Sequence, residues 1–173
     1  MSTFKAERVV KSYTMKLCKP PEKVFPLLCP VREYDWIEPW SCDMVFSQTG
    51  VAENNAVFRT NFAAQGGEET WVVIRYEKNK AIEFIRMIEG FKINRLDIAL
   101  RAEQSKTIAR WTHTYTGLSD AGNRWIRNIS DESFQSEKKA IEQMLNHYLE
   151  TGTMLKMRDL EMESDPYDPK PVR

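Results

Sequence analysis

The feature that most constrains the fold is a change of hydrophobic period along the chain. Between residues 44 and 116, short segments rich in β-branched and aromatic residues alternate with turn sequences such as Gly66-Gly67 and Glu89-Gly90. Six strands are predicted there, over residues 44–47, 56–63, 69–77, 81–88, 91–101 and 107–116. After Leu118, apolar residues recur at a spacing of three to four, which predicts one long amphipathic helix. The short links between the strands predict an antiparallel meander followed by this helix.

The flanking segments complete the order of elements. The further predicted elements are a strand over residues 9–17, short helices over residues 21–28 and 31–37, and the long helix over about residues 130–150. Pro20 and Pro21 end the first strand, Ser119 or Ser130 can cap a helix start, and Gly152 can stop the long helix. This order predicts an α+β helix-grip fold, in which a seven-stranded curved antiparallel sheet surrounds a long C-terminal helix. The space between such a sheet and its helix can become a cavity.

Length and charge limit the domain count and the partners. The chain has 173 residues, which favours a single domain over residues 1–160. Residues 161–173 contain three prolines and few apolar side chains, so they are predicted to form a disordered tail. Lys plus Arg and Asp plus Glu each number 25, so no net charge favours nucleic acid as a partner. No stretch approaches 18 apolar residues, so no membrane span is expected.

The reactive side chains do not form a known cofactor motif. The 3 cysteines include no Cys-x-x-Cys pair, so the sequence predicts neither a disulfide framework nor a zinc knuckle, and a reducing cytoplasm is the expected location. The 2 histidines, His113 and His147, lack the spacing of metal ligands. There is no Gly-x-Gly-x-x-Gly and no phosphate loop, so no cofactor is predicted.

Several motifs resemble those of one superfamily. They are Pro30-Val-Arg-Glu-Tyr-Asp-Trp-Ile-Glu-Pro-Trp-Ser-Cys42, Gly50-Val-Ala-Glu53 with Val57-Phe58-Arg-Thr60, Trp71-Val-Val, Trp111-Thr-His-Thr-Tyr-Thr-Gly-Leu-Ser119 and Leu145-Asn-His-Tyr-Leu-Glu-Thr-Gly152. Over about residues 7–155 the chain resembles bacterial SRPBCC proteins, the START/Bet v-like group of polyketide cyclase/dehydrase and lipid-transport relatives. The resemblance implies the helix-grip fold, with short helices that gate the cavity. It does not assign one activity, because the superfamily includes binders, cyclases and hydrolases.

The candidate pocket residues are the aromatic and apolar side chains expected to face the long helix. Alternation places Trp111, His113 and Tyr115 on one face of their strand, and their bulk predicts that this face looks toward the helix. The full candidate set is Trp36, Trp40, Phe58, Thr60, Phe62, Trp71, Phe84, Trp111, His113, Tyr115, Ile141, Leu145 and Tyr148. Each could instead belong to an ordinary core, and Trp36 and Trp40 could plug the end of the sheet.

The direction of four charged side chains is left open by the sequence. Arg75 and Arg86 share strand faces with aromatic residues, so they could anchor a carboxylate-bearing ligand or extend to water from the strand ends. Arg95 and Asp97 alternate with Leu and Ile, which favours the outer face of the sheet over a buried ion pair.

Three functional hypotheses follow. The first is a module that binds a small, largely apolar ligand, such as a lipid, a polyketide or an aromatic metabolite, in the cavity. The second is a polyketide cyclase/dehydratase-like enzyme that uses the same cavity, with His113 or Tyr115 as the catalytic proton carrier. The third is a partner-binding domain with a filled core. The oligomeric state is left open, with a homodimer as one option.

Overall fold

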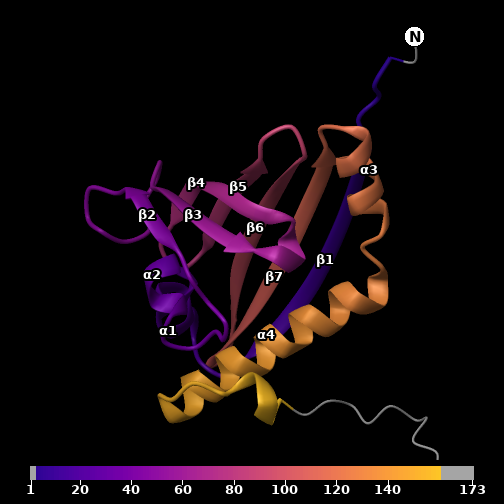
Figure 1. The fold of residues 1–173 in the computed structure, drawn as a ribbon. Coiled ribbons are helices and arrows are strands. Elements are labelled where there is room, and N and C mark those ends of the chain that lie inside the picture. The colour runs from indigo at the N-terminus through magenta and orange to yellow at the C-terminus, as the bar shows by residue number, and fades with distance from the viewer. Residues whose placement is uncertain (1–2, 161–173) are drawn as a thin grey trace, which may run out of the picture.

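Seven strands form one antiparallel sheet, in the order β1-β7-β6-β5-β4-β3-β2 (Figure 1). The computed structural model describes residues 3–160, so the tail predicted over residues 161–173 lies outside the described part of the chain. The strands are β1 Arg8–Leu17, β2 Asp43–Phe46, β3 Val57–Phe62, β4 Gly67–Glu77, β5 Ala81–Ile88, β6 Lys92–Glu103 and β7 Lys106–Gly117. Each predicted strand is present, and β1 closes the meander by pairing with β7.

The helices follow the predicted order, with one addition. They are α1 Pro21–Val24, α2 Pro30–Glu33, α3 Asp120–Arg127 and α4 Asp131–Thr151, with short 3-10 turns η1 Phe25–Leu28, η2 Ala63–Gln65 and η3 Met157–Asp159. Both candidate caps are used: the Ser119 side chain accepts from the backbone N–H of Gly122 and caps α3, and Ser130 accepts from Ser133 and caps α4. Gly152 ends α4 in the left-handed conformation, with φ of 72°.

A close backbone approach docks α3 on the sheet. A Cβ atom added at Gly122 would lie 1.8 Å from the carbonyl oxygen of Phe91, so only glycine fits there. The indole of Trp125 on α3 then packs against the rings of Phe91 and Tyr115, at centroid distances of 6.2 Å and 6.0 Å. This contact covers the end of β7, from which the chain enters α3.

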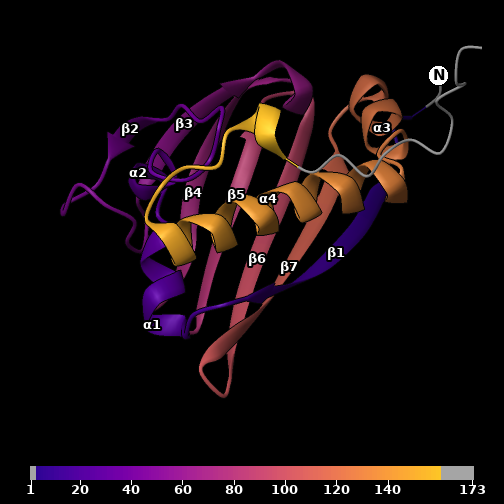
Figure 2. The same cartoon turned by 90° about the horizontal axis from the view of Figure 1, so that it is seen from below.

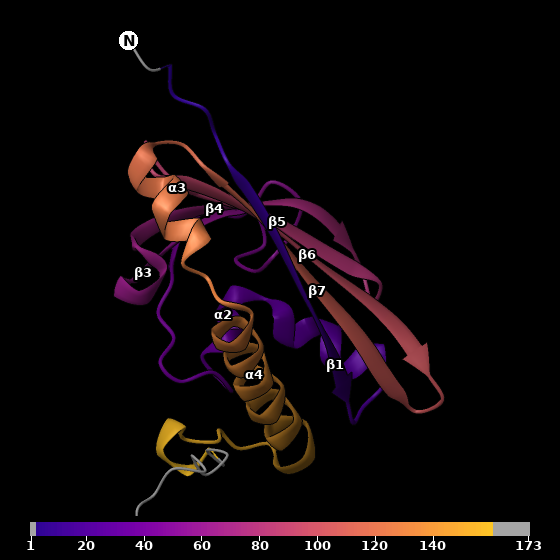
Figure 3. The same ribbon diagram turned by 90° about the vertical axis from the view of Figure 1, so that its right-hand side faces the viewer.

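The long helix α4 forms a second layer across the concave face of the sheet (Figures 2 and 3). Its buried apolar side chains are Phe134, Met144 and Leu145. Polar contacts fasten it to the edge strand β1. The carboxylate of Glu142 accepts from the Tyr13 hydroxyl and from the backbone N–H of Lys16, both at 2.6 Å. Because α4 is held at β1, the concave face of the strands beyond β7 is left partly uncovered. This is the helix-grip architecture predicted from the sequence.

Candidate functional site

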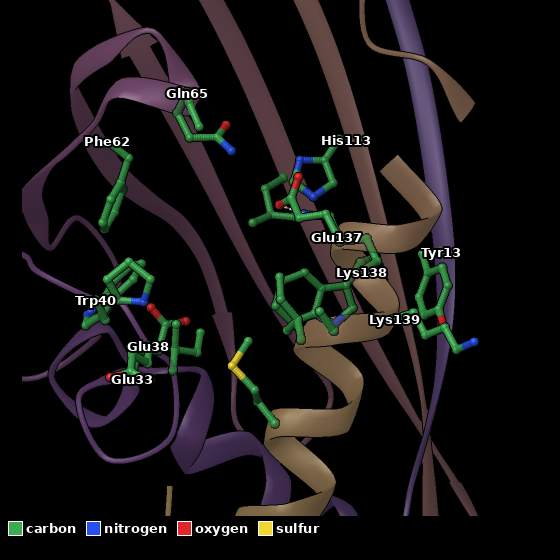
Figure 4. Close-up of a pocket in the computed structure, with 18 of the residues that line it drawn as sticks. Tyr13, Glu33, Glu38, Trp40, Phe62, Gln65, His113, Glu137, Lys138 and Lys139 are labelled. Atoms are coloured by element: carbon green, nitrogen blue, oxygen red, sulfur yellow. Dashed lines mark hydrogen bonds and ion pairs between the residues drawn. The ribbon is translucent and has the colours of Figure 1, made fainter. Parts of the chain in front are cut away.

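A cavity of about 1140 Å³ lies between the sheet and α4. This volume is slightly above the range of roughly 300–1,000 Å³ that is common for small-molecule sites in proteins. Its apolar and aromatic walls come from the short helices, the sheet and α4, and include Leu28, Phe58, Trp71, Phe84, Leu96, Ile98, Trp111, Ile141 and Met144. Figure 4 shows the more polar side chains that line the same space.

An aromatic cluster forms the wall on β3, β4 and β5. The indole of Trp71 stacks on Phe58 at a centroid distance of 5.0 Å and meets Phe84 edge-on at 5.5 Å. Trp40 contacts Trp71 and Phe62 at 6.4 Å and 5.7 Å, so the loop after α2 is attached to the sheet through this cluster. Edge-to-face and offset ring pairs of this kind are individually stabilising, which gives the cavity a firm wall.

The structure brings most, but not all, of the candidate pocket residues to the cavity. Those that line it are Trp40, Phe58, Phe62, Trp71, Phe84, Trp111, His113 and Ile141. Those that pack elsewhere are Trp36, Thr60, Tyr115, Leu145 and Tyr148.

Hydrogen bonds and packing explain the placement of the second group. The fully buried Trp36 donates from Nε1 to the carbonyl of Leu27 at 2.9 Å, so its ring is part of the core under the short helices. The Thr60 hydroxyl accepts from Trp71 Nε1 at 2.9 Å, behind the aromatic wall. Leu145 is fully buried in the core, and Tyr148 packs against that core from its edge.

His113 is a buried, neutral side chain at the cavity wall. The Asn94 amide nitrogen lies 3.0 Å from its Nδ1, and this orientation of the amide corresponds to the tautomer with the ring hydrogen on Nε2. Tyr115 packs parallel to the imidazole and places its hydroxyl 3.2 Å from the same Nδ1. Burial first, and then the charges of Lys138, Arg86 and Lys92, lower the pKa of His113 well below its usual value.

Lys138 is the functional candidate on α4 that sequence reasoning missed. Its side chain is 4% exposed and its Nζ donates to the carboxylate of Glu137 at 2.7 Å. The ammonium lies 5.9 Å from the ring centroid of Trp111 and 5.3 Å from that of Phe134. Burial lowers the pKa of Lys138, and the charge of Glu137 opposes that shift.

A signal for Lys138 was present in the sequence. It follows Phe134 by four residues and precedes Ile141 by three, so it occupies a position on the apolar stripe of the helix. A lysine at such a position is either a surface residue at the edge of the stripe or a buried functional group. The structure shows that it is buried.

A buried ionic triad lies on the sheet beside the aromatic wall. The fully buried carboxylate of Glu69 on β4 pairs with both Arg86 on β5 and Lys92 on β6. The Arg86 guanidinium also lies 3.9 Å over the ring of Trp71, and the Lys92 ammonium lies 4.5 Å from the ring centroid of Trp125. The sequence left open whether Arg86 points into the cavity or toward water. In the structure Arg86 lines the cavity.

The other three charged residues left open face outward. A register shift between Val73 and Arg75 turns Arg75 away from the cavity, where it pairs with Glu77 at 2.9 Å. Arg95 is 58% exposed and pairs with Glu83. Asp97 lies on the same side of β6 as Arg95, while Leu96 and Ile98 face the cavity.

Glu33 is a carboxyl group without a partner. It ends α2 and lies on the cavity wall with Trp40 and Glu38, across from His113 and Lys138 in Figure 4. Within residues 3–160 its carboxyl makes no hydrogen bond or ion pair, while its backbone N–H and carbonyl bond within the turn around α2. Burial raises the pKa of Glu33 to about 8, against the opposing charge of Arg86. The carboxyl is therefore mostly protonated at neutral pH.

The segment after α4 forms part of the rim of the cavity. The carboxylate of Glu38 accepts from the backbone N–H of Met157 at 2.9 Å and from Lys156 Nζ at 3.3 Å. This anchor places Met157 and Leu160 against the cavity. Neither a cluster of three metal-ligating side chains nor a helix able to span a membrane occurs within residues 3–160.

Comparison with known proteins identifies the fold. No protein-family model and no curated protein matches the chain. The solved structure of Ara h 8.0201 matches with a TM-score of 0.58 and 14% identity, over 84% of this chain and 99% of that one. The chain has the Bet v 1-like helix-grip fold.

Two further structures of this fold extend the comparison. The Aha1 dimer from Colwellia psychrerythraea matches with a TM-score of 0.55 and 20% identity, over 83% of this chain and 98% of that one. DynU16, from the dynemicin biosynthetic locus, matches with a TM-score of 0.53 and 17% identity, over 87% of this chain and 49% of that one. At these identities the likeness concerns the fold.

Proposed function

We propose that the protein binds a small, largely apolar molecule in the cavity between its sheet and α4. The observation that carries this proposal is a partly open cavity of about 1140 Å³ whose walls are mostly apolar and aromatic. Small-molecule sites are commonly concave, mostly apolar pockets with a few polar groups, and this cavity has that form. It argues against the alternative of a partner-binding domain with a filled core.

Catalysis by His113 or Tyr115 has less support. Tyr115 does not line the cavity, and burial raises the pKa of its hydroxyl, so it is a poor proton donor. His113 does line the cavity, but the low pKa of its imidazole makes it a weak base. His113 instead serves as a polar part of the wall, and Tyr115 packs against its ring.

A cavity-filling substitution tests the proposal. N-phenyl-1-naphthylamine is a neutral dye whose fluorescence rises in apolar surroundings, and we expect the protein to bind it stoichiometrically. Ala140 lies on α4 at the cavity, so Ala140→Trp should occupy the space and abolish binding. Ala102→Trp, at an exposed position of β6, is the matched control and should bind the dye as the wild type does.

The circular dichroism spectrum of both variants should match that of the wild type, which shows that the fold is intact. Dye binding that survives Ala140→Trp in a folded protein would place the dye elsewhere and contradict the proposal.

A further inference from the structure

Buried cations lie on the wall of the cavity formed by the sheet and α4, whereas Glu33 and Glu38 lie across the cavity from Lys138. Three buried cations, Arg86, Lys92 and Lys138, stand on or directly behind this wall. The carboxylates that pair with them are Glu69, which Arg86 and Lys92 share, and Glu137, which is 47% exposed. Each cation is thus paired, but two of them share Glu69 and the partner of Lys138 is partly exposed, so the Lys138 ammonium can still attract an anion in the cavity.

The same wall contains hydrogen-bond donors without acceptors. Trp111 Nε1 and His113 Nε2 are buried, and neither has a partner within the described part of the chain. The Lys138 ammonium has three N–H groups and donates to Glu137. A third unpartnered atom, the Asn94 side-chain oxygen, belongs to a residue that does not line the cavity. An unsatisfied buried donor destabilises the folded protein, and a ligand oxygen that accepts from it can recover this cost.

The donors belong to neighbouring side chains. Trp111 and His113 are two residues apart on β7 and face the same side of the sheet. Lys138 packs over Trp111, and Phe134 touches both Lys138 and the His113 ring, the latter at a centroid distance of 5.5 Å. One oxygen-bearing group of a ligand could therefore accept hydrogen bonds from Trp111, His113 and Lys138 together.

We infer that the ligand is an apolar molecule carrying one carboxylate, and that Lys138 binds this carboxylate together with the indole N–H of Trp111 and the Nε2–H of His113. The inference rests on the proposed function and adds the chemical class of the ligand. The two oxygens of a single carboxylate can accept from these donors, and its charge complements the Lys138 ammonium. The remaining, apolar part of the molecule then lies along Phe58, Trp71 and Phe84.

A matched pair of probes tests the inference. 1-Pyrenebutyrate and 1-pyrenebutanol have the same ring system and chain and differ in the terminal carboxylate. At pH 7 we expect the butyrate to bind roughly tenfold more tightly or better, which corresponds to about 1.4 kcal/mol. Lys138→Met, which keeps the length of the side chain and removes the charge, should abolish this preference. Lys106→Met, at the exposed turn between β6 and β7, should leave it unchanged.

A second variant and a spectroscopic readout guard against a misfolded Lys138→Met. Trp111→Phe removes the indole N–H and keeps an aromatic ring, and it should reduce the preference for the butyrate. In the wild type, the indole N–H resonance that this variant assigns to Trp111 should move downfield with pyrenebutyrate and stay in place with pyrenebutanol.

The outcomes separate the inference from the proposed function. Equal affinities for the two pyrenes, or a preference that persists in both variants, would overturn the carboxylate site while ligand binding stands. If neither pyrene nor N-phenyl-1-naphthylamine binds at all, the proposed function itself is wrong.

Discussion

Glu33 shows how the surroundings of a single carboxyl group can change its pKa. A carboxyl group without a charged partner is harder to ionise among protein atoms than in water. Burial therefore raises the pKa of Glu33 to about 8. Between pH 4.5, its ordinary value, and about 8, the folded protein holds a proton that the unfolded chain has released. The contribution of Glu33 to folding stability therefore falls as the pH rises through this window.

Replacing Glu33 by Gln should remove this pH dependence. Above pH 8 the variant should be more stable than the wild type by roughly 1–3 kcal/mol, since water in the cavity screens part of the burial effect. Below pH 4.5 the two proteins should unfold at similar denaturant concentrations. Urea unfolding at pH 5 and pH 9 measures the difference, with Glu22→Gln at an exposed position of α1 as the control. A wild-type stability that rises between these pH values relative to the variant would contradict the assignment.

At the scale of elements, α4 combines a structural and a functional face. Phe134 and Leu145 are buried against the sheet, while Lys138, Ile141 and Met144 line the cavity. Glu142 and Asn146 hold the helix at β1, where the Asn146 side chain accepts from Cys18 N at 2.9 Å and donates to Lys16 O at 3.0 Å. The two turns of helix around Leu145 should thus dominate stability, and the turn around Lys138 should dominate ligand binding.

Truncation of Leu145 tests this division. The side chain is fully buried, so Leu145→Ala should cost about 2–5 kcal/mol of unfolding free energy. Leu149→Ala, at a partly buried position one turn later, should cost less. Chemical denaturation of the two variants gives the comparison, and an unchanged midpoint for Leu145→Ala would mean that α4 does not pack as described.

The element order could be predicted from the sequence because each element has a local signal. Alternation and turn residues define the strands, and Ser119, Ser130 and Gly152 mark helix ends. The details of the site depend on contacts between distant segments, which have no local signal. The bulge after Val73 reverses Arg75 without any proline or glycine to announce it. The pairing of Glu69 with Arg86 and Lys92 arises only when three strands come together.

The pocket side chains illustrate the same limit. Alternation correctly groups Trp111, His113 and Tyr115 on one face of β7, and all three are buried. Which of them reach the cavity depends on where α3 and α4 cover the strand. Trp125 of α3 covers Tyr115, whereas the gap beside α4 leaves Trp111 and His113 at the cavity wall.

At the scale of the whole molecule, the cavity makes stability depend on the ligand. Side chains around an empty space lose the contacts that a filled core would give them, and the buried donors of Trp111 and His113 that lack acceptors add to this cost. A carboxylate-bearing apolar ligand would supply both the missing contacts and the missing acceptors. Such a ligand binds the folded state and not the unfolded chain, so binding shifts the folding equilibrium by mass action.

Thermal unfolding should report this linkage directly. At a free ligand concentration of 100 times Kd, a ligand that binds only the native state adds about 2.7 kcal/mol of stability. For a domain of this size, each kcal/mol raises Tm by roughly 2–4 °C, so saturating pyrenebutyrate should raise Tm by about 5–11 °C. Ala140→Trp fills the cavity, so neither pyrenebutyrate nor pyrenebutanol should raise the Tm of this variant. A rise of the same size in Ala140→Trp and in the wild type would show that the stabilising ligand binds outside the space between the sheet and α4.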